Sequence, residues 1–364
     1  MKIFFNYQIF YQQKFGGISN YFCHLNNSLK EINVETKIIC PLHINNYLKN
    51  FKKDVNGNFV HLLPSNMRKV TEYFNEKISR KIINAHKPDI IHDTYYFPKK
   101  YNSSLNSKKR VCTVFDMINE IFTKNNKHKN EISNIKKNTI YESDHIFCIS
   151  NQTKNDLINL FNIDKKKITV TYLASSLKKK TFSIKKKEFE NCLLFIGSRS
   201  GYKNFDNFIK AYARSKILKK DFKILAYGGE KVSKKEKELL LSLNINNNIK
   251  FINDKNYDLS YLYQNVKALV YPSKYEGFGL PILEAMENNC PVLSSFGGSL
   301  REIGGDGLEY FDPNFTEDIQ NLLEKILYSE KKLKELIKYG NIRFKKFSWE
   351  KCAIETNNIY KKII

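Results

Sequence analysis

The segment 266–284 constrains the fold of this chain more than any other part of its sequence. Its first part, 266–271, is a short apolar run that predicts a buried strand, and Gly277 and Gly279 follow in a loop. Pro281 then fits the first turn of a helix, where its missing N–H costs nothing. A strand, a glycine loop and a helix in this order predict one unit of an α/β sheet.

The loop of this segment suits an anionic ligand. Glycines let the backbone turn tightly and bring amide N–H groups close to a ligand. The N–H groups and the positive dipole end of the following helix suit a diphosphate. Glu276 lies in the loop and Glu284 about one turn inside the helix, so the two acids can reach opposite ends of an extended ligand. The alternative is a strand–turn–helix whose glutamates are merely solvated.

Short apolar runs alternate with longer amphipathic stretches along the whole chain, which predicts an α/β fold with mostly parallel sheets. Strands are predicted at 2–5, 35–40, 59–63, 89–92, 111–115, 145–149, 168–172, 192–197, 222–227, 249–251, 268–271, 292–295 and 308–311. Helices are predicted at 18–29, 70–86, 153–160, 204–215, 234–243, 281–288, 316–328, 331–339 and 348–363, the last with Ser348 as its N-cap.

The length of 364 residues suits two domains of ordinary size rather than one core. A basic stretch of low information at 174–190 is the predicted linker between them. No stretch approaches the roughly 20 apolar residues that span a bilayer. The N-terminus has no sustained apolar core, so it predicts a first strand rather than a signal peptide.

The seven cysteines are scattered, odd in number and without a Cys-x-x-Cys pair. Most of them fall in apolar strand patterns. We therefore expect buried, reduced thiols in a cytosolic protein, with neither a zinc site nor disulfides.

The formal net charge of +24 is compatible with nucleic acid, an anionic membrane surface or acidic small-molecule substrates as partners. The lysines come mostly in short runs, such as 165–167, 178–180 and 185–187, and no RNA-binding or helix-turn-helix signature accompanies them. Specific nucleic-acid binding is therefore not expected. Two interpretations stay open: peripheral association with an anionic membrane surface, and an ordinary solvated basic surface.

In each half, one further motif follows the first strand. In the second half, Arg199 and Lys203 lie four residues apart between a strand and a helix, where a guanidinium fork and a point charge could clamp a diphosphate. Ordinary surface cations are the alternative. In the first half, Gly16 and Gly17 start a helix and permit close approach of the backbone to a phosphate or sugar.

The segment 271–284 resembles the Glu-x7-Glu signature of glycosyltransferase family 4, the retaining enzymes also called glycosyl transferases group 1. The resemblance covers nearly the whole chain and is strongest from residue 192 onward. It implies the GT-B architecture, an α/β fold with two Rossmann-like domains facing across a cleft. The implied parts are an acceptor-binding domain at 1–173, the linker at 174–190, a nucleotide-sugar-binding domain at 191–346, and a helix at 347–364 that crosses back to the first domain.

The resemblance also implies residue roles. The implied donor-binding residues are Gly16, Gly17, Arg199, Lys203, Gly277, Phe278, Gly279, Leu280 and Glu284, and the implied catalytic residues are Glu276, His92 and Asp116. Glu276 would position the sugar and face its developing positive charge, while Glu284 would bind the ribose. Because cations already stand at the diphosphate, no metal or other cofactor is expected.

The chain departs from the family at one position. Family members often carry a histidine just before Asp116, where it contacts the donor sugar, but this chain has Phe115. His92 and Asp116 remain as polar candidates, although a lone histidine at the end of a strand can equally be structural. Ser150 and Thr153 are predicted to cap a helix, and the glycine pair 297–298 is interpreted as architecture.

The implied reaction moves a sugar from a nucleotide diphosphate to a hydroxyl of a glycan or lipid-linked acceptor, with retention, in lipopolysaccharide, capsule or other surface-glycan synthesis. The expected location is the cytoplasm or the inner face of the membrane. A nucleotide-sugar epimerase or hydrolase, which would need no acceptor, and an inactive binding protein are the alternatives. The intact set of Arg199, Lys203, Glu276 and Glu284 counts against the binding protein.

Overall fold

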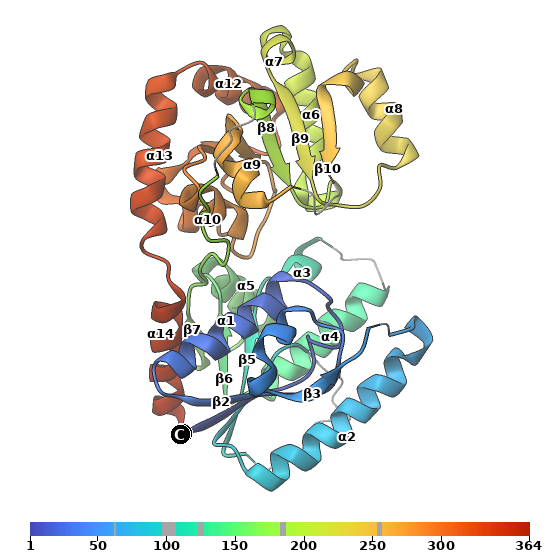
Figure 1. The fold of residues 1–364 in the computed structure, drawn as a ribbon, viewed down its shortest axis with the longest axis vertical. Coiled ribbons are helices and arrows are strands. Elements are labelled where there is room, and N and C mark those ends of the chain that lie inside the picture. The colour runs from blue at the N-terminus through green and yellow to red at the C-terminus, as the bar shows by residue number, and fades with distance from the viewer. Residues whose placement is uncertain (62, 97–106, 123–126, 183–186, 253–256) are drawn as a thin grey trace. The chain divides into compact units, whose positions relative to one another are not determined.

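The computed structural model describes residues 1–364 except 62, 97–106, 123–126, 183–186 and 253–256. The chain forms two compact units, one of residues 1–173 with 348–364 and one of residues 174–347. Each unit has its own parallel sheet between helices (Figure 1). The predicted α/β fold with two parallel sheets is therefore confirmed.

The first unit contains a seven-stranded sheet in the order β3-β2-β1-β4-β5-β6-β7. Its strands are β1 (Lys2–Phe5), β2 (Glu35–His43), β3 (Val55–Phe59), β4 (Ile90–Asp93), β5 (Lys109–Val114), β6 (His145–Cys148) and β7 (Ile168–Val170). Its helices are α1 (Gly17–Glu31), α2 (Arg68–His86), α3 (Ile118–Phe122), α4 (Lys127–Tyr141), α5 (Asn151–Phe161) and α14 (Trp349–Ile363). The strand order reverses between β1 and β4, which is where such sheets open a crevice for ligands.

The second unit contains a six-stranded sheet in the order β10-β9-β8-β11-β12-β13. Its strands are β8 (Cys192–Ile196), β9 (Lys223–Tyr227), β10 (Ile249–Ile252), β11 (Ala268–Tyr271), β12 (Val292–Ser295) and β13 (Glu309–Phe311). Its helices are α6 (Phe205–Arg214), α7 (Lys216–Asp221), α8 (Lys234–Ser242), α9 (Leu259–Asn265), α10 (Leu280–Glu287), α11 (Leu300–Gly304), α12 (Thr316–Leu327) and α13 (Glu330–Phe344). Here the order reverses between β8 and β11.

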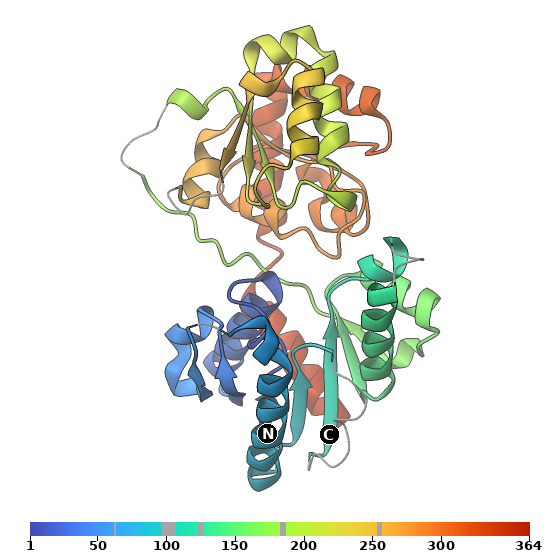
Figure 2. The ribbon, with the colours of Figure 1, turned by 90° about the vertical axis from the view of Figure 1, so that its right-hand side faces the viewer.

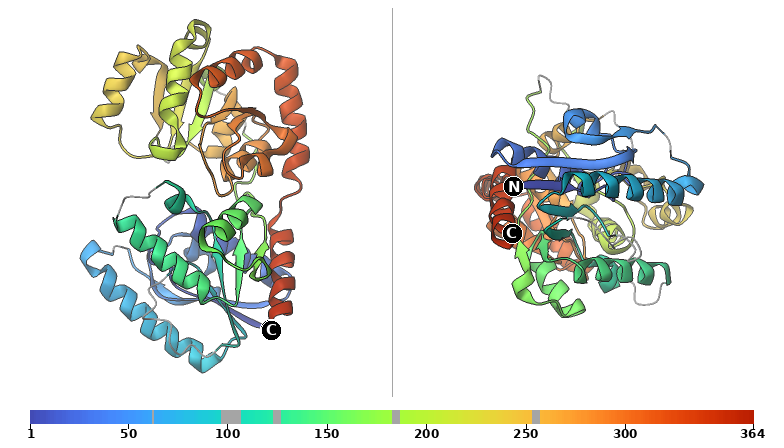
Figure 3. Two further views of the ribbon diagram at one scale, coloured as in Figure 1. Left: turned by 180° about the vertical axis from the view of Figure 1, so that it is seen from behind. Right: turned by 90° about the horizontal axis from the view of Figure 1, so that it is seen from below.

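The last helix, α14, packs on the first unit, beside α1 (Figure 3). Its first residue, Trp349, stacks on His24 with ring centroids 4.9 Å apart. Near its end, the hydroxyl of Tyr360 lies 2.5 Å from Nδ1 of His92. Ser348 caps the helix as predicted, because its Oγ accepts the N–H of Lys351 at 3.1 Å.

The stretch predicted as a linker is partly bound to the second unit. The N–H of Lys180 donates to Oγ of Ser260 at 3.2 Å, and Gln264 donates to the carbonyl of Lys180 at 2.9 Å. The Lys180 side chain also pairs with Asp258, which caps α9. Residues 183–186 of the predicted linker lie outside the described part. Around Lys180 this stretch is therefore bonded to α9 of the second unit and is not a free connection (Figure 2).

One strand differs clearly from the prediction. The strand expected at 59–63 is β3, four residues earlier, and its sequence Val-Asn-Gly-Asn-Phe is mostly polar. A polar strand is tolerated there because β3 forms the edge of the sheet. Gly57 is needed for this pairing, since a Cβ would lie 1.7 Å from the carbonyl oxygen of Cys40 on β2.

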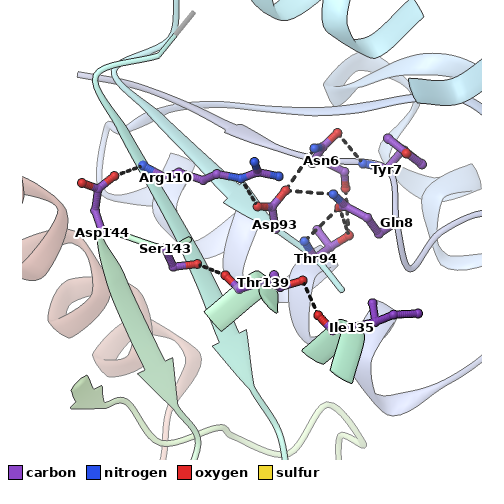
Figure 4. A network of polar contacts seen from close by, with 10 residues as sticks. All are labelled: Asn6, Tyr7, Gln8, Asp93, Thr94, Arg110, Ile135, Thr139, Ser143 and Asp144. Carbon is purple, nitrogen blue, oxygen red and sulfur yellow. Dashed lines mark hydrogen bonds and ion pairs between the residues drawn. The ribbon is translucent and has the colours of Figure 1, made fainter. Parts of the chain in front are cut away.

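A buried carboxylate fixes the chain that follows β1 (Figure 4). Asp93, at the end of β4, accepts hydrogen bonds from Asn6 at 3.0 Å, from Gln8 at 2.8 Å and from Arg110 at 2.5 Å. The N–H of Thr94 also donates to Gln8 at 3.2 Å. A buried charge needs such partners. The network therefore holds the loop between β1 and α1 against β4.

All seven cysteines are buried and unpaired, which confirms the prediction of buried thiols. Across the described ranges, none of the helices combines the length and the apolar character needed to cross a bilayer.

Candidate functional site

The two motifs of the second unit meet at the switch point of its sheet. The loop 197–204 follows β8 and the loop 272–279 follows β11, and these strands are neighbours. The N–H of Lys274 donates to the carbonyl of Tyr202 at 2.7 Å, and the amide of Asn204 donates to the carbonyl of Pro272 at 3.1 Å. The loops are thus tied together where parallel sheets bind ligands.

Lys203, Tyr271 and Glu276 form a compact polar cluster at this point. Nζ of Lys203 lies 2.7 Å from Oε1 of Glu276, and the Tyr271 hydroxyl donates to the same oxygen at 2.9 Å. Nζ of Lys203 is also 3.2 Å from the Tyr271 hydroxyl. The two charged side chains are only 15% and 9% exposed. The structure therefore joins two residues that the sequence placed in separate motifs, and it adds Tyr271, which the sequence analysis missed.

The loop after β12 supports the backbone of Glu276. Both the N–H and the hydroxyl of Ser299 donate to the carbonyl of Glu276 at 3.0 Å. Gly298, at φ 64°, packs so closely that a Cβ would lie 2.4 Å from the same carbonyl oxygen. Sequence reasoning missed Ser299, although its place directly after the glycine pair was a usable signal.

Helix α10 begins at the end of the loop 272–279, which follows β11. Gly279, its N-cap, is left-handed with φ 93° and has no side chain with which to cap the helix, and Pro281 lies in the first turn as predicted. The first-turn amides therefore carry the positive end of the helix dipole without a side-chain cap from that residue. Phe278 is buried edge-on against Phe347 at 6.0 Å, so its side chain packs the loop.

Glu284 is half-buried on α10, and its environment is unlike that of a solvated acid. Burial raises the pKa of its carboxyl to about 7, although the hydroxyl of Tyr263 donates to Oε2 at 3.0 Å. The nearby Glu287 raises the pKa further. The carboxyl therefore gains or loses its proton near neutral pH.

We expect Glu284→Gln to remove a pH dependence from both stability and donor binding. The folded-state pKa lies above the unfolded value of about 4.3, so the stability of the wild type falls as pH rises from about 4.5 to 7. The variant should be more stable than the wild type by about 1 kcal/mol at pH 8 and equally stable at pH 4.5. Denaturant unfolding at the two pH values measures this difference.

The carboxyl of Glu284 should also make the donor KM depend on pH. Low pH should weaken donor binding, although it stabilises the fold. The resemblance implies that Glu284 binds the ribose of the donor. Protonation would remove that carboxylate, so the KM of the wild type should rise as pH falls from 8 to 6. In Glu284→Gln it should be high and flat. A variant KM that still followed pH would show that another group titrates there.

Arg199, which the resemblance places at the donor diphosphate, makes three hydrogen bonds within the protein. Its Nε donates to Glu236 at 2.7 Å, Nη1 to the carbonyl of Gly228 at 2.9 Å and Nη2 to the carbonyl of Glu230 at 2.5 Å. Its side chain is only 3% exposed. Gly229 allows this approach, because a Cβ would lie 2.7 Å from Nη1. Three of the five guanidinium N–H groups are thus committed to one loop and one helix.

Glu236 completes the capping box of α8 with Ser233. Partial burial would raise the pKa of Glu236, but hydrogen bonds from Ser233 and from Arg199 lower it below its usual value. A hollow of about 400 Å³ adjoins this pair, lined among others by Ser198, Gly201 and Lys235. Arg199 therefore fixes a wall of this hollow, which the loop 198–201 also lines.

We expect Arg199→Lys to be far from neutral, because one ammonium cannot replace a fork with three partners. The free energy of unfolding should fall by about 2 kcal/mol, and the donor KM should rise. Glu236→Gln is the matched variant: it keeps the shape of the acid and removes its charge. If Arg199 only holds the wall, both variants should raise KM; a rise with Arg199→Lys alone would place the guanidinium on the donor.

His92 lies in the interior of the first unit, not at an open edge. It is 0% exposed, Nδ1 lies 2.5 Å from the hydroxyl of Tyr360 and Nε2 lies 2.8 Å from the hydroxyl of Thr113. Burial lowers its pKa to about 3, so the ring is neutral at physiological pH. Nδ1 thus contacts a side chain of α14, and Nε2 contacts a side chain of β5. These contacts favour the structural alternative for His92 over the catalytic role that the resemblance implies.

The other candidates of the first unit are placed less decisively. Oδ1 of Asp116 accepts the N–H of Ile118 at 3.0 Å at the start of α3, and its carbonyl accepts from Lys136 at 3.0 Å. Phe115 packs against Tyr21 and Phe22 at 5.3 and 6.0 Å between ring centroids. The position where the family often has a histidine is thus part of an aromatic cluster.

Gly16 and Gly17 start α1 as predicted, but for different reasons. A Cβ on Gly16 would meet the Gln13 side chain at 2.1 Å, whereas a Cβ on Gly17 would have no heavy atom within 4 Å. Close approach of a ligand to these two glycines remains a prediction. Ser150 caps α5 as predicted, accepting the N–H of Thr153 at 3.1 Å.

The structure thus brings Lys203, Glu276 and the start of α10 to one edge of the second sheet, with Glu284 one turn further along the helix. Within the residues described, no three side chains among His, Cys, Asp and Glu are grouped so as to hold a metal ion. The arrangement can bind an anionic group at the loops and can present a carboxylate beside it.

Two family models match consecutive parts of the chain: "Glycosyltransferase Family 4" over residues 15–174 and "Glycosyl transferases group 1" over residues 176–343. The O-antigen chain mannosyltransferase RfbU of Salmonella typhimurium is 30% identical over 192 residues, which are 52% of this chain and 53% of the relative. The O-antigen chain mannosyltransferase B of Escherichia coli is 29% identical over 281 residues, 70% of each chain. The chain thus aligns with about half of the first relative.

Among solved structures, the fold is similar to that of Anabaena Alr3699/HepE in complex with UDP and glucose. The TM-score is 0.76 at 15% identity, over 100% of both chains, and an identity this low shows the fold alone. The predicted GT-B fold is therefore confirmed. With two consecutive family models over most of its length and the Lys203–Glu276 cluster at the switch point, the chain belongs to the family 4, group 1 glycosyltransferases.

Proposed function

We propose that this glycosyltransferase moves a sugar from a nucleotide diphosphate sugar to a hydroxyl acceptor with retention of the anomeric configuration. The observation that carries the proposal is the Lys203–Glu276 pair, 2.7 Å apart, beside the start of α10. A buried cation and helix amides suit a leaving diphosphate, and the carboxylate next to them suits a cationic sugar.

Departure of the nucleotide diphosphate builds negative charge on its oxygens. Lys203 and the amides at Gly279 and Leu280 would stabilise that charge, and Glu276 would face the positive charge of the sugar. Glu284 would bind the ribose. We favour attack from the same face, with the leaving phosphate taking the proton of the acceptor, because the two carboxylates do not flank one bond as in a glycosidase.

We further propose a mannosyl donor and an acceptor from surface-glycan synthesis, a glycan or a lipid-linked sugar. The support is that the two curated relatives are O-antigen chain mannosyltransferases. The protein would then work in the cytoplasm, at the inner face of the membrane. The HepE structure contains UDP and glucose, so uridine donors are the natural comparison.

The test is a donor screen that measures release of the nucleotide diphosphate from guanosine- and uridine-linked mannose and glucose, each with and without a lipid-linked acceptor. We expect acceptor-dependent turnover of a mannosyl donor, and an NMR coupling constant that shows retention in the product. Glu276→Gln serves as the control for contaminating activity. Equal release without acceptor would favour a hydrolase, and an inverted product would refute retention.

Turnover should need no divalent metal, because Lys203 and the helix amides already neutralise the diphosphate. We expect kcat to be unchanged within about twofold after EDTA treatment and on addition of Mg²⁺ or Mn²⁺. The measurement is the initial rate of the wild type with the best donor in the three conditions. Activity that disappears with EDTA and returns with either ion would contradict the proposal.

A further inference from the structure

Helix α2 buries mostly polar residues against the first unit and leaves its aromatic side chains exposed. Its buried residues are Thr71, Asn75, Glu76, Ser79 and Ile83. Its exposed large apolar residues, with the N-cap residue included, are Met67 at 48%, Val70 at 62%, Tyr73 at 49% and Phe74 at 44%. A surface helix normally buries its apolar stripe. This reversed arrangement needs a partner for the outer side.

The orientation of α2 is fixed by contacts on its inner side. The Asn75 side chain, 0% exposed, accepts the N–H of Leu42 at 2.7 Å and donates to the carbonyl of Leu42 at 2.9 Å. Further along, Ile83 packs in a cluster with Phe4, Ile39 and Ile91. The helix cannot turn its outer side inward without losing these contacts.

The exposed residues form one continuous stripe. Val70, Phe74, Lys77 and Lys81 follow one another at helical spacing, and Tyr73 lies beside them. Nζ of Lys77 lies 4.7 Å above the ring of Tyr73. Phe74 also lines a hollow of about 460 Å³ together with Leu42 and Val55 of the neighbouring strands. Figures 1 and 2 show α2 along the periphery of the first unit.

The charge on this outer side has one sign. The exposed cations on this side and at its edge are Lys69, Lys77 and Lys81; Arg68 lies by helical spacing on the side of the buried Asn75 and acts on Tyr11. The acids of the helix turn away from them: Glu76 is buried and paired with Arg80. Glu72 is half-buried and acts on the buried hydroxyls of Tyr7 and Tyr11. Apolar and cationic side chains therefore share a side from which the acids are turned away.

We propose that α2 is the surface by which this protein lies on an anionic phospholipid bilayer. Val70, Tyr73 and Phe74 enter the boundary between headgroups and acyl chains, and the cations of the stripe contact lipid phosphates. The cations beside the apolar stripe favour an anionic bilayer as the partner, because its surface offers both lipid phosphates and an apolar interior. The inference rests on the proposed function only in that a lipid-linked acceptor gives the enzyme a reason to be there.

The experiment is flotation of the full-length protein with vesicles of phosphatidylcholine alone or with one third phosphatidylglycerol, at low and high salt. The wild type should bind only the anionic vesicles, more weakly at high salt. Replacing Lys69, Lys77 and Lys81 with glutamine should weaken binding on the order of a hundredfold, since each cation near such a surface contributes about fivefold. Val70→Ser, Tyr73→Ser and Phe74→Ser together should weaken it at least about tenfold.

The matched control removes three exposed lysines from α13 of the second unit, Lys331, Lys334 and Lys338. It lowers the net charge by the same amount and should keep most of the binding. Equal loss in the control would show attraction by the whole basic surface and would overturn the proposal. The alternative is that a second copy of the chain covers the stripe, and light scattering without lipid tests it. If the wild type is a dimer and the apolar variant a monomer, the stripe is a dimer interface and the proposal is overturned.

Failure of this proposal can be told from failure of the proposed function. Nucleotide release with a water-soluble acceptor and no vesicles should be the same for the wild type and both α2 variants. If no sugar nucleotide turns over but binding to anionic vesicles still needs α2, only the proposed function fails. If turnover is normal and the α2 variants bind vesicles like the wild type, only the membrane surface fails.

Discussion

Glu276→Gln is expected to lower kcat by about 10²- to 10³-fold with a smaller change in donor KM. The carboxylate of Glu276 is 9% exposed and accepts from both Lys203 and Tyr271, so its charge is held in a poorly solvated place. Such a charge acts most strongly when the sugar becomes cationic, and a neutral amide of the same shape cannot provide it. Steady-state kinetics with the best donor separates kcat from KM.

Tyr271→Phe is the matched control for this prediction. It removes the 2.9 Å hydrogen bond to Glu276 and leaves both charges in place. We expect a loss of about tenfold or less, since one neutral hydrogen bond contributes about 1 kcal/mol. Equal losses in both variants would mean that the position of Glu276 matters rather than its charge. A normal kcat in Glu276→Gln would refute its catalytic role.

Gly298→Ala is expected to reduce the free energy of unfolding by about 3 kcal/mol and to remove most of the activity. A left-handed backbone costs a residue with a Cβ about 1 kcal/mol. The larger part comes from collision, because the Cβ would lie 2.4 Å from the carbonyl oxygen and 2.7 Å from the nitrogen of Glu276. Backbone cannot move aside as a flexible side chain can, so Glu276 itself must shift.

Gly201→Ala separates the two causes. Gly201 has φ 63°, nearly the same as the 64° of Gly298, but a Cβ there would have no heavy atom within 4 Å. Its cost should therefore be the conformational part alone, about 1 kcal/mol. Denaturant unfolding of the two variants gives the difference. Equal destabilisation would show that the loop around Glu276 yields easily to the extra methyl group.

The strands and the longer helices of the second unit could be predicted well because their signals are local, whereas the short helices α7, α9 and α11 were not predicted. The apolar runs and the glycine and proline positions located β11 and α10 to within a residue, and β12 at its observed bounds. The meeting of Lys203 with Glu276 was also within reach, because loops at the carboxyl ends of neighbouring parallel strands lie close together. What the sequence could not show was the support that other loops give, such as that of Ser299.

Arg199 and His92 show what the sequence could not reveal about the predicted site residues. Each has the local signature of a ligand-binding residue at the end of a strand. Their actual partners are far away in the chain: Glu236 is 37 residues from Arg199, and Tyr360 is 268 residues from His92. A pattern read over a short window carries no information on such partners. Tertiary packing determines whether the side chains of Arg199 and His92 hydrogen-bond within the protein, and a short sequence motif does not report that packing.

The position of α14 has a consequence for the order in which the chain can fold during synthesis. The second unit is one continuous stretch, whereas the first unit needs residues 348–364, which leave the ribosome only after the whole second unit. Until then His92 lacks Tyr360, and the face of α1 that receives Trp349 is uncovered. N-terminal domains usually fold first on the ribosome. Here the second unit can reach its native state first, and the earlier-made unit must wait, incomplete, for its final helix.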